Sequence, residues 1–176
     1  MLKSNNVFVQ RYKTPYGELL IGAFNEQLCL CDWQYRRMRT TIDKRIQSAL
    51  SAEYIEQPCS TIDKTIRQLD EYFANQREQF DLPLLMLGTD FQQTVWKTLL
   101  TIPYGSTNSY LELANNVGNE KAVRAVATAN GANAMSIVIP CHRVIGSGGE
   151  LTGYAGGLPA KKRLLALEQD LSNKHC

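Results

Sequence analysis

The spacing of apolar residues changes near the middle of this 176-residue chain, and that change limits the fold more than any other feature. The first half opens with three runs rich in strand-forming residues, at 7–12, 19–24 and 28–33. Turn signals such as Thr14-Pro15-Tyr16-Gly17 separate them, which predicts an antiparallel meander. An amphipathic helix is predicted to follow from Ser60.

Residues 77–88 lose this periodicity, and helical spacing returns after them. We therefore predict an α+β protein with two domains, at residues 1–84 and 89–176, joined by a linker at 85–88. The first is a small antiparallel β-sheet domain with a helix, and the second is mainly helical.

Two short helices are predicted on either side of Gly118. Apolar residues recur at helical spacing from Tyr110 to Val117 and again from Val123 to Ala127. These proportions are typical of a helix-turn-helix, although a plain helical hairpin gives the same pattern. Arg124 lies beside the second apolar stripe, where a solvated charged face is the ordinary interpretation.

Composition narrows the function classes. The net charge of +2 indicates no broadly basic surface, so a nucleic-acid site would have to be local. We find no apolar run of transmembrane length and no secretory signal, and we expect a cytoplasmic protein that does not enter membranes. The five cysteines are then expected to be thiols.

A metal site is not expected. Cys29 and Cys31 are two residues apart, and the only histidines are His142 and His175. Since a structural zinc site needs four well-spaced ligands, small apolar thiols are the simpler interpretation of Cys29, Cys31 and Cys59. We expect neither a metal nor another cofactor.

The hexapeptide Ile139-Pro140-Cys141-His142-Arg143-Val144 joins a cysteine to a histidine behind a proline. The apolar run at 137–139 predicts a buried strand or extended segment, and Pro140 suits the start of a helical turn. Such a position favours thiolate at Cys141, and Arg143 adds positive potential. Sequence adjacency does not establish that the Cys141 and His142 side chains touch.

Glu168 is an anomaly on the C-terminal helix predicted from Leu158. It falls on the same face as Leu164, where a carboxylate is costly unless it is paired. It either reaches the rim of this face or pairs with His142, completing a Glu168–His142–Cys141 series of orienting residue, base and nucleophile.

Two glycine-rich loops lie between the cysteine and this helix. The first contains Ser147, and the second contains Tyr154 and Ala155. Such loops let backbone groups approach a ligand closely, but they also suit simple hairpin turns.

The segment Ile139-Pro140-Cys141-His142-Arg143-Val144-Ile145 resembles the active-site signature of the O6-alkylguanine-DNA alkyltransferases. The resemblance extends from about Phe91 to Glu168, and it is weaker in the N-terminal half. It implies a ribonuclease H-like N-terminal domain and a winged-helix-like C-terminal domain. Further matching motifs are Val95-Trp96, Ile102-Pro103-Tyr104-Gly105, Val123-Arg124-Ala125-Val126, Asn133, Gly153-Tyr154 and Gly156-Gly157-Leu158.

The resemblance also implies a role for each candidate residue. Cys141 would take the alkyl group irreversibly, activated by His142 and Glu168 through a water. Tyr110 would assist nucleotide rotation and protonate the leaving guanine. Arg124 would fill the base stack, and Asn133 would brace the active-site turn. The substrate-contacting residues would be Val144, Ser147, Tyr154 and Ala155.

The implied partner is duplex DNA containing O6-alkylguanine, bound by a monomer through the minor groove with the damaged base flipped out. O4-alkylthymine is a second candidate substrate. A zinc site known in some family members is not expected here, because the N-terminal half has no histidine. In this sequence Ala134 follows Asn133, where many relatives have proline.

Two other classes of function stay open. A thiol hydrolase using Cys141, His142 and Glu168 would turn over repeatedly and would not need Arg124. A DNA-binding regulator or lesion sensor would keep its activity after Cys141→Ala.

Overall fold

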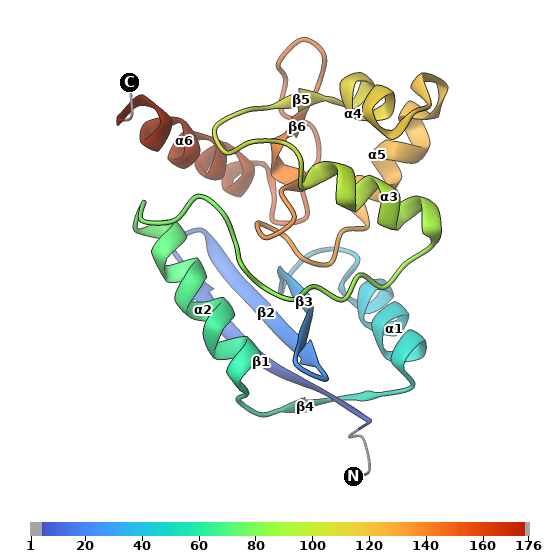
Figure 1. Cartoon of the computed structure of the whole chain (residues 1–176), viewed down its shortest axis with the longest axis vertical. Coiled ribbons are helices and arrows are strands. Elements are labelled where there is room, and N and C mark those ends of the chain that lie inside the picture. Colours follow the sequence, from blue (N-terminus) through green and yellow to red (C-terminus); the bar gives the residue numbers. More distant parts are fainter. Residues whose placement is uncertain (1–4, 175–176) are drawn as a thin grey trace. The chain divides into compact units, whose positions relative to one another are not determined.

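The computed structural model describes residues 5–174, with side chains described for residues 5–170. The chain divides into two compact units, Met1–Leu87 and Gly88–Cys176, and each is described by itself (Figure 1). His175 and Cys176 lie outside the described residues.

A four-stranded sheet forms the centre of the first unit, in the order β3-β2-β1-β4. The antiparallel meander is confirmed, since β2 pairs antiparallel with both β1 and β3. The predicted antiparallel sheet differs from the observed one in its edge strand: β4 pairs with β1 in parallel, so the sheet is mixed. The strands span Asn6–Thr14 (β1), Gly17–Phe24 (β2), Gln27–Trp33 (β3) and Glu53–Glu56 (β4).

Tight turns set the register of the meander. The predicted turn joins β1 to β2, with the Thr14 hydroxyl donating to the Gly17 carbonyl at 2.8 Å. Between β2 and β3, Asn25 and Glu26 both have positive φ, at 48° and 65°. Two left-handed residues in succession match the twist of a two-residue hairpin.

Two helices complete this unit. The predicted helix is α2 (Ser60–Phe73), and it packs against β1, β2 and β3 through residues that include Ile62, Leu69 and Tyr72. Helix α1 (Arg39–Leu50) was not predicted, because it buries only Ile42 and Ile46 and its apolar pattern is weak.

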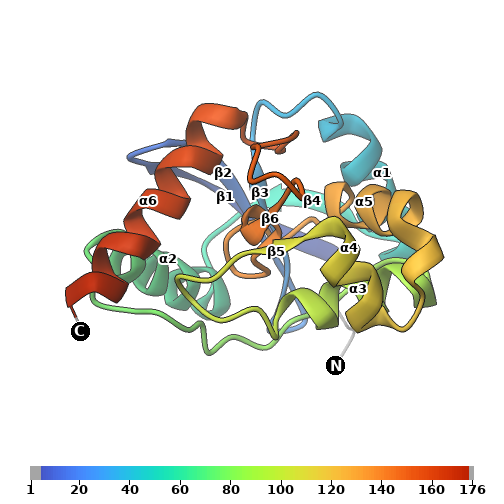
Figure 2. The ribbon, with the colours of Figure 1, turned by 90° about the horizontal axis from the view of Figure 1, so that it is seen from above.

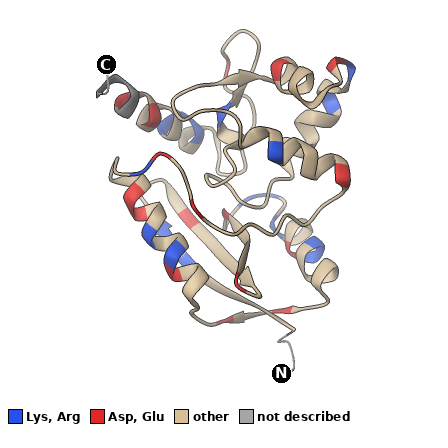
Figure 3. Cartoon of the chain, in the orientation of Figure 1, with Lys and Arg blue, Asp and Glu red and all other residues tan. Residues whose placement is uncertain are grey.

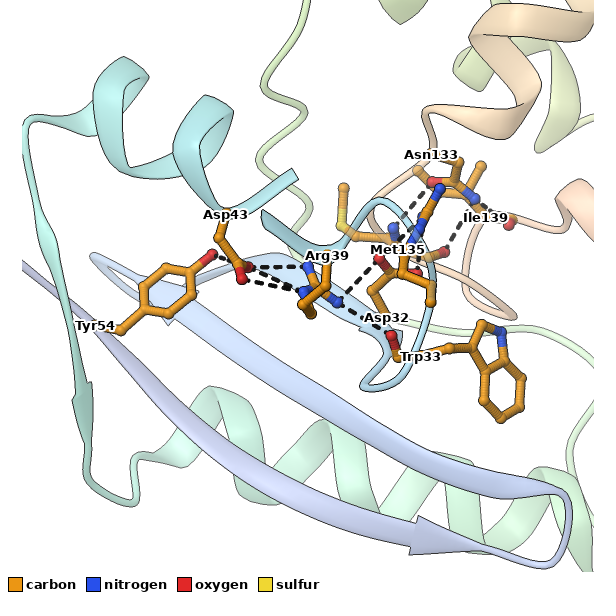
Figure 4. A network of polar contacts seen from close by, with 9 residues as sticks. Asp32, Trp33, Arg39, Asp43, Tyr54, Asn133, Met135 and Ile139 are labelled. Carbon is orange, nitrogen blue, oxygen red and sulfur yellow. Dashed lines mark hydrogen bonds and ion pairs between the residues drawn. The ribbon is translucent and has the colours of Figure 1, made fainter. Parts of the chain in front are cut away.

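A buried carboxylate links the end of β3 to α1 and β4 (Figure 4). Asp32 is fully buried and accepts from Arg36 and Arg39 at 3.0 and 3.1 Å. Arg39 also pairs with Asp43, which accepts a hydrogen bond from the Tyr54 hydroxyl at 2.9 Å. This network satisfies a charge whose burial would otherwise be costly.

The second unit is mainly helical, as predicted. Its first helix, α3 (Asp90–Leu99), begins with a capping box made by Thr89 and Gln92 and buries Trp96, whose indole N–H donates to the Ala129 carbonyl at 2.9 Å. The longest helix is α6 (Leu158–Lys174). Within the described part of the chain, no helix has the length and apolar character needed to cross a membrane.

Two helices around Gly118 form the predicted helix-turn-helix. Helix α4 (Tyr110–Val117) starts with a Ser109–Glu112 capping box and ends at Gly118, whose φ of 98° suits a residue without a side chain. Asn119 caps a short 3₁₀ helix, η1 (Glu120–Ala122), which leads directly into α5 (Val123–Gly131). Helices α3, α4 and α5 all contact one another, which fixes the helix-turn-helix on a common core.

Candidate active site

Cys141 follows two consecutive tight turns. Ile137 has a φ of 71°, rare for a β-branched residue, and the Val138 N–H donates to the Ser136 carbonyl at 2.8 Å. At Pro140 (φ −81°, ψ 62°) the Cys141 N–H donates to the Ile139 carbonyl at 2.8 Å. The apolar run at 137–139 is therefore a buried turn, and the prediction of a buried strand or extended segment is correct only in the burial. Cys141 then opens a three-residue 3₁₀ helix, η2 (Cys141–Arg143).

Asn133 supports this turn from the end of α5 (Figure 4). Its side-chain amide donates to the Ile139 carbonyl at 2.9 Å, and its side-chain oxygen accepts from the Met135 N–H at 2.9 Å. Only 2% of Asn133 is exposed, so both bonds lie away from solvent. The asparagine thus couples the end of α5 to the backbone just before Cys141.

His142 and Glu168 are in direct contact. The His142 Nε2 atom lies 2.7 Å from a Glu168 carboxylate oxygen, and the two residues are 0% and 1% exposed. Of the two arrangements left open for Glu168, the paired one is present. Cys141 is also buried, at 5% exposure.

Arg143 is a second partner of Glu168. Its Nε and Nη2 atoms each donate to a Glu168 oxygen at 2.9 Å, and its Nη1 atom donates to the Ile102 carbonyl at 2.7 Å. Sequence reasoning gave Arg143 a general electropositive role at Cys141, whereas the structure pairs its charge with Glu168. No sequence pattern within one element reports this contact, because the two residues lie 25 positions apart.

The electrostatics keep Glu168 ionised. Burial alone would raise the pKa of Glu168, but the charge and hydrogen bonds of His142 and Arg143 outweigh it and lower that pKa to about 2. The carboxylate therefore remains an acceptor for the His142 ring at neutral pH.

A short parallel ladder joins the residues just before Tyr110 to the residues just after η2, and Figure 2 shows the two strands, β5 and β6, side by side. Strand β5 (Asn108–Ser109) immediately precedes Tyr110, and it pairs with β6 (Val144–Ile145), which immediately follows η2. The Tyr110 phenol oxygen accepts a hydrogen bond from the Thr152 hydroxyl at 3.0 Å. Tyr110 is thereby connected to the loop between β6 and α6.

Lys161 is a residue that sequence reasoning missed. It is fully buried in the first turns of α6, and its ammonium group donates to the carbonyls of Val144 and Thr152 at 2.6 and 3.0 Å. Burial lowers the pKa of Lys161, and the interaction with Cys141 acts in the opposite direction. Its position three residues before Leu164 and seven before Glu168 was the signal that it shares their buried face.

The glycine-rich loops differ in exposure. The Tyr154 ring lies edge-on to the His142 ring, with centroids 6.5 Å apart, and Ala155 beside it is half-buried. Ser147 is exposed in a turn closed by a hydrogen bond from the Gly149 N–H to the Gly146 carbonyl, with φ of 84° at Gly149. The structure thus places Tyr154 beside the histidine and Ser147 on the surface.

Arg124 lies apart from the buried cluster, exposed on the first turn of α5. It is the only charged residue in the sequence of that helix. Figure 3 shows how Lys and Arg, in blue, and Asp and Glu, in red, are distributed along the chain. Lys121, which precedes α5 in η1, is also exposed. The helix face around Arg124 is therefore open to a partner but only weakly basic.

These features define a helix-turn-helix protein that carries a buried cysteine next to a histidine–glutamate pair. Residues 90–170 match the family described as "6-O-methylguanine DNA methyltransferase, DNA binding domain", and residues 7–86 match its "ribonuclease-like domain". The chain belongs to this family of O6-alkylguanine-DNA alkyltransferases, which confirms the resemblance and the α+β fold class.

Individual relatives with this family's name are similar to the chain in sequence and in structure. The methylated-DNA–protein-cysteine methyltransferase of Methanosarcina barkeri is 50% identical over 90% of this chain and 94% of its own. That of Mycobacterium bovis is 56% identical, and the aligned part spans 59% of this chain and 63% of the relative's length. The crystal structure of Mycobacterium tuberculosis OGT in complex with DNA superposes with a TM-score of 0.80 at 39% identity, covering 94% of each chain.

Proposed function

We propose that this protein repairs DNA by transferring one methyl or larger alkyl group from O6-alkylguanine in duplex DNA to Cys141. The observation that carries the proposal is a buried His142–Glu168 pair, with Nε2 of the histidine 2.7 Å from a carboxylate oxygen. The histidine of this pair directly follows the buried Cys141 in the sequence. Family membership and relatives named methylated-DNA–protein-cysteine methyltransferases support the same reaction.

The proton path follows from which nitrogen of His142 is already occupied. Glu168 holds Nε2, whereas Nδ1 is buried and has no hydrogen-bond partner among the described protein atoms. We assign Nδ1 as the atom that takes the Cys141 proton through a water molecule. Arg143 holds the Glu168 carboxylate in place, so that it orients the ring and stabilises the imidazolium that forms.

The chemistry explains why each molecule acts once. The thiolate sulfur of Cys141 attacks the saturated carbon, a sulfur–carbon bond forms, and the bond from that carbon to the guanine oxygen breaks. The product is a thioether rather than the thioester of a cysteine hydrolase, so water does not regenerate the thiol. Repair is then stoichiometric, unlike the repeated turnover of a hydrolase.

Residues around the cysteine would hold the flipped base. Tyr110 would protonate the leaving guanine, and the loop of Tyr154 and Ala155 would form a pocket wall. The Val144 carbonyl already accepts from Lys161, and its second lone pair would remain for the exocyclic amine of guanine. O4-alkylthymine, with an equivalent alkylated oxygen, is a second candidate substrate.

DNA would bind at the helix-turn-helix from the minor-groove side. Extruding a base costs a few kcal/mol, and Arg124 on exposed α5 would occupy the gap in the stack. Asn133 would transmit the position of α5 to the cysteine turn through its two buried hydrogen bonds. Exposed Ser147 would contact the DNA backbone. Because the nucleophile must stay reduced, we place the activity in the cytoplasm.

Peptide mass mapping tests this proposal. The protein is incubated with a duplex oligonucleotide carrying one O6-methylguanine, digested, and searched for added methyl groups. We expect one methyl group on the peptide that contains Cys141, none in Cys141→Ala, and an unchanged result in Cys59→Ser, the control thiol of the other unit. A methyl group on Cys29, Cys31 or Cys59 would contradict the mechanism.

A further inference from the structure

Thr152 lies between two residues of the candidate site and contacts both. Its hydroxyl donates to the Tyr110 phenol oxygen at 3.0 Å, and its carbonyl accepts from the Lys161 ammonium at 3.0 Å. Lys161 also donates to the Val144 carbonyl at 2.6 Å, directly after the cysteine turn. The buried Lys161 ammonium thus holds the backbone carbonyl of Thr152, and the Thr152 hydroxyl in turn holds the Tyr110 phenol.

This arrangement determines where the Tyr110 hydrogen can point. The phenol oxygen accepts from Thr152, so its own single hydrogen is not used in that bond. A donor on the phenol oxygen also stabilises negative charge there once the proton has left. Both effects favour donation from Tyr110 to a ligand.

We propose that Thr152 is a positioning residue for methyl transfer, which orients Tyr110 to protonate the leaving guanine and stabilises the phenolate that results. The inference rests on the proposed function. Lys161 acts one step further away, because it holds the Thr152 carbonyl and the Val144 carbonyl at fixed positions.

The step balances as follows. The electron pair of the broken carbon–oxygen bond stays on the guanine, which takes the Tyr110 proton and leaves as neutral guanine. Tyr110 is briefly a phenolate that accepts from Thr152, and it regains a proton from solvent. The proton released by Cys141 goes to His142 and then to solvent, so the net change is one alkyl group exchanged for one proton on sulfur.

The test compares Thr152→Val, which keeps the shape but lacks the hydroxyl, with Thr152→Ser, which keeps the hydroxyl. Single-turnover rates on O6-methylguanine duplex are measured together with duplex affinity. We expect Thr152→Val to slow transfer about tenfold at unchanged affinity, and Thr152→Ser to recover to within roughly threefold of the wild-type rate. Thr94→Val, whose lost hydroxyl bonded only to a carbonyl of α3, should react like wild type.

A double-mutant cycle separates orientation of Tyr110 from a general structural role. In a Tyr110→Phe background, Thr152→Val should cause no further loss, because the phenol oxygen that it supports is gone. Equal losses in both backgrounds, or an unimpaired Thr152→Val, would overturn this inference. A wild-type protein that transfers no methyl group would instead refute the proposed function, so the two failures are distinguishable.

Discussion

Replacing Glu168 with glutamine should destabilise the C-terminal unit, because it removes the buried negative charge that His142 and Arg143 hold. The pKa of Glu168 falls from an ordinary 4.5 to about 2, even though burial alone would raise it. Since each tenfold change in proton affinity corresponds to 1.36 kcal/mol, the carboxylate contributes about 3 kcal/mol near neutral pH. Losing one member of a buried ion pair costs about 3–5 kcal/mol in other proteins, which agrees.

The sign of the pH dependence is also fixed. Because the pKa of Glu168 is lower in the folded state, its stabilising contribution is complete above about pH 4.5 and is lost as the pH falls toward 2. Glu168→Gln should therefore be less stable than wild type by about 3 kcal/mol near neutral pH and should approach wild-type stability in acid.

Urea unfolding followed by tryptophan fluorescence measures this difference. Trp33 lies in the first unit and Trp96 in the second, so a Trp33→Phe background reports on the unit that contains Glu168. Asp170→Asn, an exposed carboxylate on the same helix, is the matched control and should change stability by less than about 0.5 kcal/mol. A Glu168→Gln variant as stable as this control, or equally destabilised at every pH, would refute the reasoning.

Three further predictions follow from the same contacts. Arg124→Ala should slow repair of duplex DNA at least about tenfold, while its rate of reaction with free-base O6-alkylguanine should stay within about twofold of the wild-type rate. Equal losses in these two rate assays would reject a role of Arg124 in base extrusion. Asn133→Ala should destabilise the protein by about 1–3 kcal/mol in urea unfolding, because it leaves the buried Met135 N–H and Ile139 carbonyl without their side-chain partner. A change below about 0.5 kcal/mol would argue against a role of Asn133 in bracing the turn before Cys141. Burial raises the pKa of Cys29 to about 12 and also raises the pKa of Cys31, so iodoacetamide near pH 8 should label neither thiol until urea unfolds the protein. Rapid labelling of these two thiols in the native protein would contradict this prediction.

Patterns within one element were enough to predict much of the fold. The helix from Ser60 carries a strong apolar face, and the helix-turn-helix is marked by Gly118 and by capping residues such as Ser109. Helix α1 escaped prediction because its apolar residues are few. The parallel pairing of β4 with β1 depends on a contact across more than 40 positions, which no local pattern records.

In the candidate site, too, residues that depend on contacts between distant segments were harder to predict from the sequence. Glu168 was noticeable because a carboxylate stood on an apolar helix face, and Lys161 occupies that face too but was hidden in a run of charged residues. The turn at Ile137 depends on a left-handed conformation that isoleucine rarely adopts, so the apolar run at 137–139 indicated the burial of this segment but not its turn. The Thr152–Tyr110 bond joins the loop before α6 to the first residue of α4, and only the folded chain brings these two segments together.

Stoichiometry is the most direct test of the claim that Cys141 is a nucleophile consumed in one reaction. Limiting amounts of the protein are added to excess O6-methylguanine duplex, and the repaired DNA is counted at completion. The account predicts a plateau at one repaired lesion per protein molecule, with all Cys141 converted to S-methylcysteine. Product that continues to accumulate beyond that plateau, or repair by Cys141→Ala, would contradict it.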